Sequence, residues 1–174
     1  MSAPFASRES LHDALRSVGY LADDTIVTVA LLAHRLGKPV LAEGPAGTGK
    51  TALAKALADL TGARLVRLQC YEGLDEAKVL YEWDYRRQLL RMQASGSSWE
   101  EVRGELFSDE YLLERPLLEA IRSDEPVVLL VDEVDRVEVE TEALLLEVLA
   151  ELQVTVPELW TLRARSTPTV VLTS

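Results

Sequence analysis

The chain has 174 residues, and its 18 lysines and arginines against 29 aspartates and glutamates give a formal net charge of −11. This length suits one domain with a sizeable core, and 48% apolar with 27% charged residues is an ordinary globular composition. The acidic balance argues against a nucleic-acid binder, which needs a positive surface for phosphates, but it allows a small anionic ligand.

The first part of the chain predicts two helices and two strands. Residues 23–36 have helical apolar spacing after a capping aspartate at 23 or 24, and Gly37 ends that helix. A short apolar strand follows at 39–42. The i, i+3, i+4, i+7 spacing from Leu53 predicts an amphipathic helix that ends near Gly62, and the alternation in residues 64–70 predicts a second strand.

The middle of the chain, residues 74–123, is predicted to be mostly helical. One helix has Val79, Trp83, Arg86 and Leu90 on one face and ends before Ser95. A second is expected to begin at Trp99, because Ser98 and Glu101 match a capping box. A third begins at Pro116 and runs to about Ser123.

The last part predicts a buried strand, a helix, a hairpin and a final strand. Residues 127–131 are five consecutive apolar residues, as in strands covered on both faces of a parallel sheet. A helix follows at 140–152, a hairpin around Pro157 at 153–165, and a buried strand at 169–172. Strands that alternate with helices in this way indicate an α/β domain with a parallel sheet.

Few residues could form a disulfide or a zinc site. Cys70 is the only cysteine, and His12 and His34 are the only histidines, so neither kind of site is expected and Cys70 is predicted to be packed in the core. Residues 1–9 lack the features of a signal peptide, and no run reaches the ~20 apolar residues of a membrane span. The sequence therefore predicts a cytoplasmic, soluble protein.

Residues 44–51 read GPAGTGKT and fit the phosphate-binding pattern G-x-x-x-x-G-K-[ST] between a predicted strand and a predicted helix. The glycines let successive backbone amides point at phosphate oxygens, and the helix adds its positive N-terminal end. Lys50 is expected to reach the β- and γ-phosphates and the Thr51 hydroxyl to ligate Mg²⁺. The expected nucleotide-binding residues are Gly44, Pro45, Ala46, Gly47, Thr48, Gly49, Lys50 and Thr51, together with Asp132.

Asp132 and Glu133 follow the buried strand at 127–131, and so lie at the carboxyl edge of the predicted sheet, where ligands bind in such folds. Asp132 is expected to hold Mg²⁺ through a water molecule, and Glu133 to orient or deprotonate the attacking water. Small-molecule kinases with the same loop do not need such a glutamate. The pair therefore favours ATP hydrolysis, with Glu133 and Lys50 as catalytic residues.

With these motifs placed, the chain resembles the AAA+ ATPases from about Tyr20 to Ser174. GPAGTGKT is similar to the family's Walker A motif, and LLVDEVDR at 129–136 to its Walker B motif. The segments 70–93 and 145–159 resemble the MoxR branch found beside carbon monoxide dehydrogenase-type molybdenum enzymes. The resemblance implies a three-layer P-loop core with strand order 5-1-4-3-2. It divides the chain into a helical lead-in at 1–38, a Walker A and B core at 39–152, and a hairpin insert with the sensor-1 strand at 153–174.

The resemblance also implies partners. It indicates an ATP-driven ring, commonly a hexamer, that remodels a client such as a von Willebrand A domain protein or matures a molybdenum enzyme. Residues 20–24 would help to enclose the adenine. The hairpin would face the partners or the pore through Glu158, Trp160 and Arg163, although Trp160 could equally be a buried hairpin residue.

Two charged segments have both a functional and an ordinary interpretation. Arg86, Arg87 and Arg91 could contact a neighbouring ring subunit or simply form a polar helix face. Six glutamates between 138 and 158, with no lysine or arginine among them, could dock a basic partner, but we interpret them as a solvated helix face.

The end of the sequence departs from the family pattern. Ser174 stops just short of the sensor-1 asparagine, and the fifth strand, the arginine finger, the helical lid and the sensor-2 arginine are missing. We therefore expect a fragment or a truncated product, with its first strand at an open sheet edge. A non-hydrolysing nucleotide-binding or interaction module remains an alternative, and a small-molecule phosphotransferase is the least favoured one.

Overall fold

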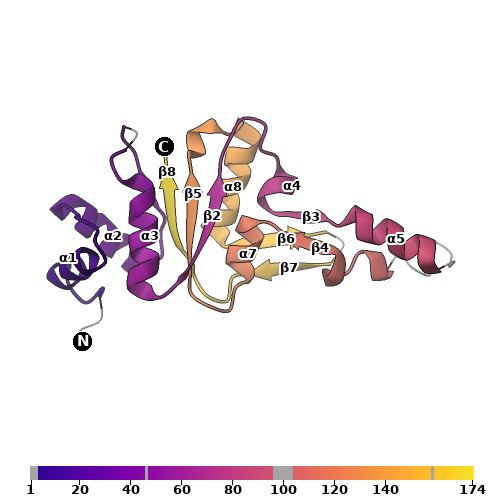
Figure 1. The fold of residues 1–174 in the computed structure, drawn as a ribbon, viewed down its shortest axis with the longest axis horizontal. Coiled ribbons are helices and arrows are strands. Elements are labelled where there is room, and N and C mark those ends of the chain that lie inside the picture. Colours follow the sequence, from indigo (N-terminus) through magenta and orange to yellow (C-terminus); the bar gives the residue numbers. More distant parts are fainter. Residues whose placement is uncertain (1–3, 46, 96–103, 158) are drawn as a thin grey trace.

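A parallel sheet of four strands lies at the centre of the computed structural model (Figure 1). The structure describes residues 4–45, 47–95, 104–157 and 159–174. The strands are β1 (Val40–Ala42), β2 (Arg64–Gln69), β5 (Val127–Asp132) and β8 (Thr169–Thr173), in the spatial order β1-β8-β5-β2. This is the 1-4-3-2 part of the predicted order. β1 lies at the edge, as expected.

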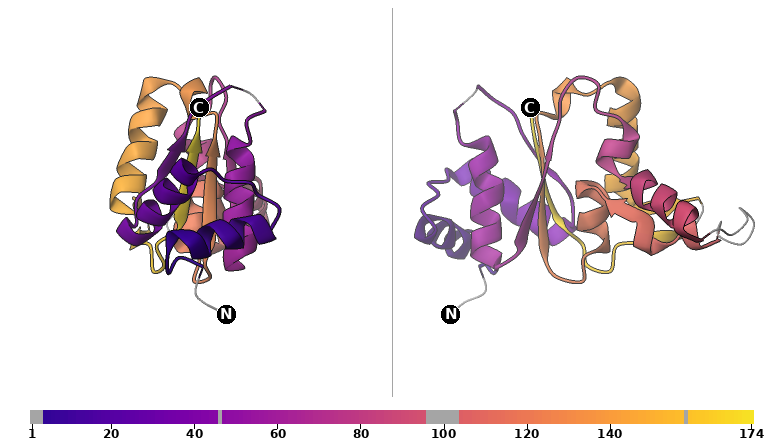
Figure 2. Two further views of the ribbon diagram at one scale, coloured as in Figure 1. Left: turned by 90° about the vertical axis from the view of Figure 1, so that its left-hand side faces the viewer. Right: turned by 45° about the vertical axis from the view of Figure 1, so that its right-hand side comes forward.

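Helices cover both faces of this sheet, so the domain has three layers (Figure 2). One face carries α1 (Arg8–Ser17), α2 (Asp24–Leu36) and α3 (Lys50–Thr61); the other carries α4 (Glu76–Val79), α7 (Pro116–Arg122) and α8 (Val139–Glu151). The α/β fold with a parallel sheet is therefore confirmed. No helix in the described ranges combines the length and the apolar character that crossing a bilayer requires.

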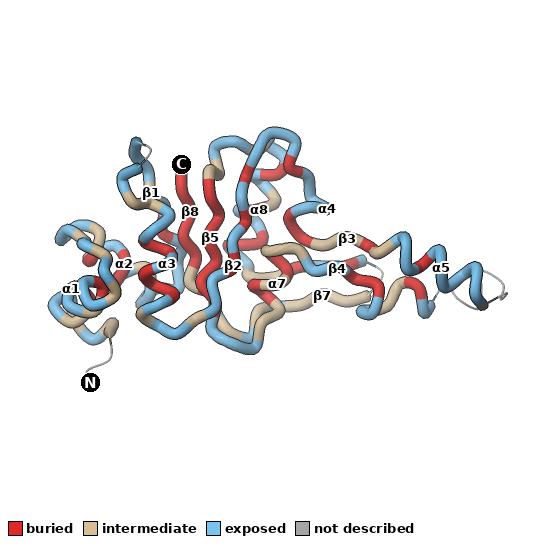
Figure 3. Tube along the Cα trace, viewed as in Figure 1, coloured by how far each residue is buried: buried red, intermediate tan, exposed pale blue. Residues whose placement is uncertain are grey.

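The central strand β5 explains why two separate cores form. All six of its residues are buried (Figure 3), and alternate side chains of a strand point to opposite faces. Val128 and Leu130 pack with α1, α2 and α3, whereas Leu129 and Val131 pack with α7 and α8. The apolar run at 127–131 is thus the buried strand that the sequence predicts.

Several helix ends lie where local sequence signals predict them. The Asp23 carboxylate accepts a hydrogen bond of 2.8 Å from the Ile26 amide at the start of α2, and Gly37 ends the helix in the left-handed region. Pro116 occupies the first turn of α7. Helix α1 is an addition to the predicted elements. Its signals were a capping Ser7 and two apolar residues four positions apart that are buried here.

The predicted long helix through Trp83 is wrong. The chain forms α4, then β3 (Tyr81–Trp83), then α5 (Tyr85–Ser95), and β3 pairs antiparallel with β4 (Leu112–Glu114). Trp83 is buried and meets Phe107 edge-on at 5.2 Å, so aromatic packing on a sheet surface outweighs helical spacing. Leu90, expected on the same face, is exposed.

The rest of the middle segment contains less helix than the sequence predicts. The 3-10 helix η1 (Asp109–Tyr111) and β4 occupy a stretch predicted to be mostly helical. The start of the predicted second helix, at Ser98 and Trp99, lies outside the described residues. On α5, Arg87 pairs with Glu110 and Arg91 with Glu105, both at 3.0 Å, so these two cations serve internal contacts.

The predicted hairpin is present as β6 (Gln153–Val156) and β7 (Trp160–Arg163). Trp160 is partly buried, and the Arg122 guanidinium of α7 lies 5.3 Å from its ring centre. Arg163 is exposed and donates to Gln153 at 2.7 Å. Glu158 lies outside the described residues. The α8 glutamates at 142, 147 and 151 are exposed, in keeping with a solvated face.

Candidate functional site: a phosphate-binding loop facing two acidic residues

The loop between β1 and α3 depends on glycine for its shape. Gly44, Gly47 and Gly49 all have positive φ angles, of 148°, 84° and 90°. A Cβ on Gly47 would meet no atom within 4 Å, so the backbone conformation rather than a lack of space requires glycine there. Gly49 is the N-cap of α3, and the first turn of α3 contains no acidic residue. The positive helix end therefore stays available to an anion. Ala46 lies outside the described residues.

Lys50 closes over this loop. Its ammonium donates to the carbonyl oxygens of Gly44 and, at 3.3 Å, of Pro45. The Thr48 hydroxyl also donates to Pro45, at 2.9 Å. The Lys50 ammonium is thus held beside the loop by neutral carbonyl oxygens. Anionic oxygens could take their place, and hydrogen bonds from the ammonium to them would be stronger because both groups are charged.

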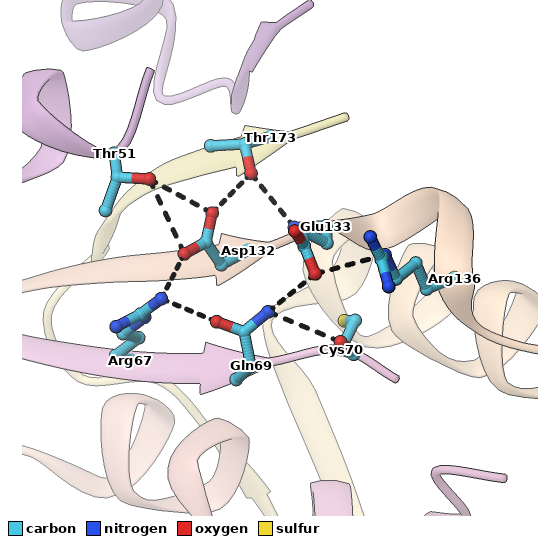
Figure 4. A network of polar contacts seen from close by, with 8 residues as sticks. All are labelled: Thr51, Arg67, Gln69, Cys70, Asp132, Glu133, Arg136 and Thr173. Atoms are coloured by element: carbon cyan, nitrogen blue, oxygen red, sulfur yellow. Dashed lines mark hydrogen bonds and ion pairs between the residues drawn. The ribbon is translucent and has the colours of Figure 1, made fainter. Parts of the chain in front are cut away.

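Asp132, at the end of β5, is the most heavily bonded side chain of the site (Figure 4). Its carboxylate accepts hydrogen bonds from Thr173 at 2.6 Å, from Thr51 at 3.2 Å and from Arg67. Burial raises the pKa of Asp132, but the hydrogen bonds from Thr173 and Arg67, with the Arg67 charge, outweigh burial and hold the pKa below its usual value. The carboxylate is therefore kept ionised.

Glu133 has different surroundings. Its backbone lies in the left-handed region, at φ 58° and ψ 50°, which is uncommon for a residue with a side chain. The Thr173 hydroxyl fixes this turn by accepting the Glu133 amide at 2.9 Å. The half-exposed carboxylate accepts from Gln69 and Arg136, each at 3.1 Å, and it faces the same space as Lys50 and Asp132.

Two adjoining hollows share the loop. A cleft of about 610 Å³ is lined by polar groups that include Lys50, Thr51, Arg67, Asp132 and Glu133. A second hollow of about 440 Å³ lies beside Thr48 and Lys50 and is more apolar, with Ile26, Val29 and Leu41 among its lining residues. The first hollow therefore brings cationic donors and carboxylates together, and the second offers a more apolar wall beside them.

Comparisons with known proteins agree with this geometry. The AAA domain family (dynein-related subfamily) matches residues 39–173. The chain belongs to this family. It resembles a crystal structure of a candidate ATPase from Cytophaga hutchinsonii with a TM-score of 0.58 and 18% identity, over 96% of this chain and 43% of that one. A Lon protease from Methanosarcina barkeri is 34% identical over 71 residues, which are 41% of this chain and 9% of the protease.

These shares mean that the chain spans less than half the length of either protein.

Membership of the AAA family implies nucleotide binding, usually with Mg²⁺, and typically oligomerisation. The described residues fit the metal, because Thr51 and Asp132 offer hard oxygen donors 3.2 Å apart. Mg²⁺ prefers oxygen ligands and keeps several of its waters, so a hydroxyl beside a carboxylate that can act through a water molecule suits it.

The structure brings together four residues singled out from the two motifs, namely Lys50, Thr51, Asp132 and Glu133. The motifs do not include Arg67, Gln69 and Thr173, which complete the network. A signal for the first two was present, because residues 67 and 69 share one face of a strand that ends beside β5.

Cys70 is buried as expected, and burial, followed by the nearby charges of Asp132, Asp135 and Glu133, raises the pKa of its thiol to about 11.

Proposed function

We propose that this chain is the nucleotide-binding part of an ATP-hydrolysing AAA+ motor. One observation carries the proposal: Lys50 and Thr51 from the loop line the same cleft as Asp132 and Glu133 from the end of β5. Phosphoryl transfer to water requires cationic and amide donors for the phosphates, oxygen ligands for a metal, and a base beside them. The residues of this cleft offer all three.

Each residue then has a defined role. Lys50 and the backbone N–H groups of residues 47–51 hold the β- and γ-phosphates, with Lys50 exchanging its loop carbonyls for phosphate oxygens. Thr51, and Asp132 through a water molecule, would hold Mg²⁺, which would neutralise phosphate charge when bound. Glu133 accepts the proton of the attacking water, since its half-exposed carboxylate is held toward the cleft by Gln69 and Arg136.

The second hollow is the proposed place for the adenine ring. Tyr20 and Asp23 line it together with apolar residues of α2 and β1, which supports the expectation that residues 20–24 help to enclose the base. The proposed division of the chain follows: 1–38 is a helical lead-in, 39–152 the Walker A and B core, and 153–174 the hairpin and the sensor-1 strand.

We further assign the chain to the MoxR type, as a cytoplasmic ring, commonly hexameric, that remodels a von Willebrand A domain protein or matures a molybdenum enzyme. The resemblance of residues 70–93 and 145–159 supports this finer assignment. The first of these segments contains most of α5, which extends away from the sheet (Figure 1). The hairpin at 153–163 offers the exposed Arg163 and the partly buried Trp160 to a partner.

The Glu133→Gln variant tests the hydrolytic role. The amide keeps the size of the side chain but cannot accept a proton, so the variant should bind an ATP analogue as the wild type does. It should release phosphate at least about 100-fold more slowly, the lower range for general-base catalysis. The measurement is phosphate release by each purified chain in the presence of ATP and Mg²⁺.

Exposed Glu142→Gln on α8 is the matched control and should leave turnover unchanged. Equal turnover by Glu133→Gln and the wild type would remove Glu133 from its role. Tight binding of ATP with no turnover by the wild type would favour the non-hydrolysing module.

A further inference from the structure

Arg67 belongs to neither nucleotide motif, yet it contacts the centre of the site. It lies on β2, with its side chain about half exposed, and lines the same cleft as Lys50 and Thr51. Its guanidinium donates to the Asp132 carboxylate and also to the Gln69 side-chain oxygen, at 2.5 Å (Figure 4). Two hydrogen bonds therefore hold the side chain against the site, although about half of it is exposed.

The position of this cation bears on the metal site. Asp132 is the buried carboxylate whose oxygens lie within 3.2–3.5 Å of the Thr51 hydroxyl. The guanidinium donates a hydrogen bond to the Oδ2 atom of that carboxylate. Its positive charge also repels any other cation that approaches the carboxylate. A divalent ion that uses Asp132 must therefore overcome both the hydrogen bond and the charge of Arg67.

We propose that Arg67 is a positioning residue that competes with Mg²⁺ for the Asp132 carboxylate. Arg67 holds the Asp132 carboxylate before the nucleotide arrives, and it leaves the carboxylate when the metal–nucleotide complex binds. Arg67 thereby sets the Mg²⁺ concentration at which the site fills. This inference rests on the proposed function, because it concerns the metal that accompanies ATP.

The test is a Mg²⁺ titration of the binding of a fluorescent ATP analogue, which measures occupancy and not turnover. Arg67→Gln removes the charge and keeps a polar side chain. The Mg²⁺ concentration at half-maximal binding should fall roughly three- to tenfold, as expected for a partly exposed charge-assisted contact. Arg67→Lys keeps the charge and should stay near the wild-type midpoint.

Arg64→Gln is the matched control, because it removes the same charge from the same strand, where the half-exposed Arg64 side chain pairs with Glu119 of α7. Its midpoint should stay within about twofold of the wild type. Circular dichroism of each variant checks that the fold is kept. If Arg67→Gln does not fold, Arg67→Met, which also removes the charge, is expected to show the same lowered midpoint.

Four results would overturn the inference. They are an unchanged midpoint in Arg67→Gln, a raised midpoint, an equal shift in Arg64→Gln, and a midpoint in Arg67→Lys as low as in Arg67→Gln. Weaker analogue binding in Mg²⁺-free buffer with an unchanged midpoint would place Arg67 on the phosphates instead. If the wild type binds no analogue at any Mg²⁺ concentration, the proposed function fails, and the inference fails with it.

Discussion

At the scale of single residues, the two adjacent acids of the site differ in burial, in backbone conformation and in their hydrogen-bond partners. Asp132 is buried, and three side chains donate to its carboxylate. Glu133 is half exposed on a strained backbone and has two partners at its surface. A fixed, ionised carboxylate suits a metal ligand, and a more accessible one suits a base. Environment, more than residue type, separates the two proposed roles.

The pKa of Asp132 predicts how stability depends on pH. The pKa is lowered by folding, so the stabilisation is complete above the ordinary value of 3.8 and is lost as the pH falls through the lower folded value. Asp132→Asn should therefore lower the free energy of unfolding at neutral pH by roughly 1–2 kcal/mol, and this gap should shrink as the pH falls below the ordinary value. Urea unfolding from neutral pH down to about pH 3 measures it.

The exposed Asp135 provides the control for this series. Asp135→Asn should follow the wild type throughout. A gap between Asp132→Asn and the wild type that stays constant with pH would contradict the assigned cause.

At the scale of elements, the segment from 76 to 95 shows how packing overrides local spacing. Tyr81 and Trp83 could have lain on a helix, but pairing with β4 lets Trp83 bury its ring against Phe107. Asp84 then caps α5 by accepting the Arg87 amide at 3.0 Å. The segment therefore forms helix, strand and helix within twenty residues.

Trp83→Ala tests this arrangement. Trp83 is 7% exposed, so its loss should cost about 3–5 kcal/mol of unfolding free energy. Tyr85→Ala, two residues on but 64% exposed, should cost no more than about 0.5 kcal/mol. Urea unfolding of both variants measures these losses, and similar losses of unfolding free energy in the two variants would contradict the placement of β3.

The elements that could be predicted are those whose signals are local. The caps of α2, the proline of α7 and the apolar run of β5 lie within a few residues of what they specify. β3 depends on a partner about thirty residues away, which spacing along the chain does not reveal. Likewise Lys50 and Asp132 belong to contiguous motifs, whereas Arg67 enters the site only because β2 ends beside β5.

At the scale of the whole molecule, the sheet order assembles the site. β5 lies between β8 and β2, so Asp132 meets Thr173 on one side and Arg67 on the other. The loop after β1 reaches the same edge through α3, which packs on β5 and β8. The parallel arrangement places all these carboxyl ends together, as in other α/β sheets that bind ligands at this edge.

The measurement that tests the central claim most directly is Mg²⁺-dependent binding of a fluorescent ATP analogue to three chains: the wild type, Lys50→Ala and Lys55→Ala. Lys55 is an exposed lysine of the same helix, so its substitution removes an equal charge away from the loop. We predict saturable binding by the wild type and Lys55→Ala, and binding weaker by at least about 100-fold in Lys50→Ala, since a cation on phosphate oxygens contributes about 3 kcal/mol. Equal binding by all three chains, or binding by none, would contradict the assignment of this loop to phosphate.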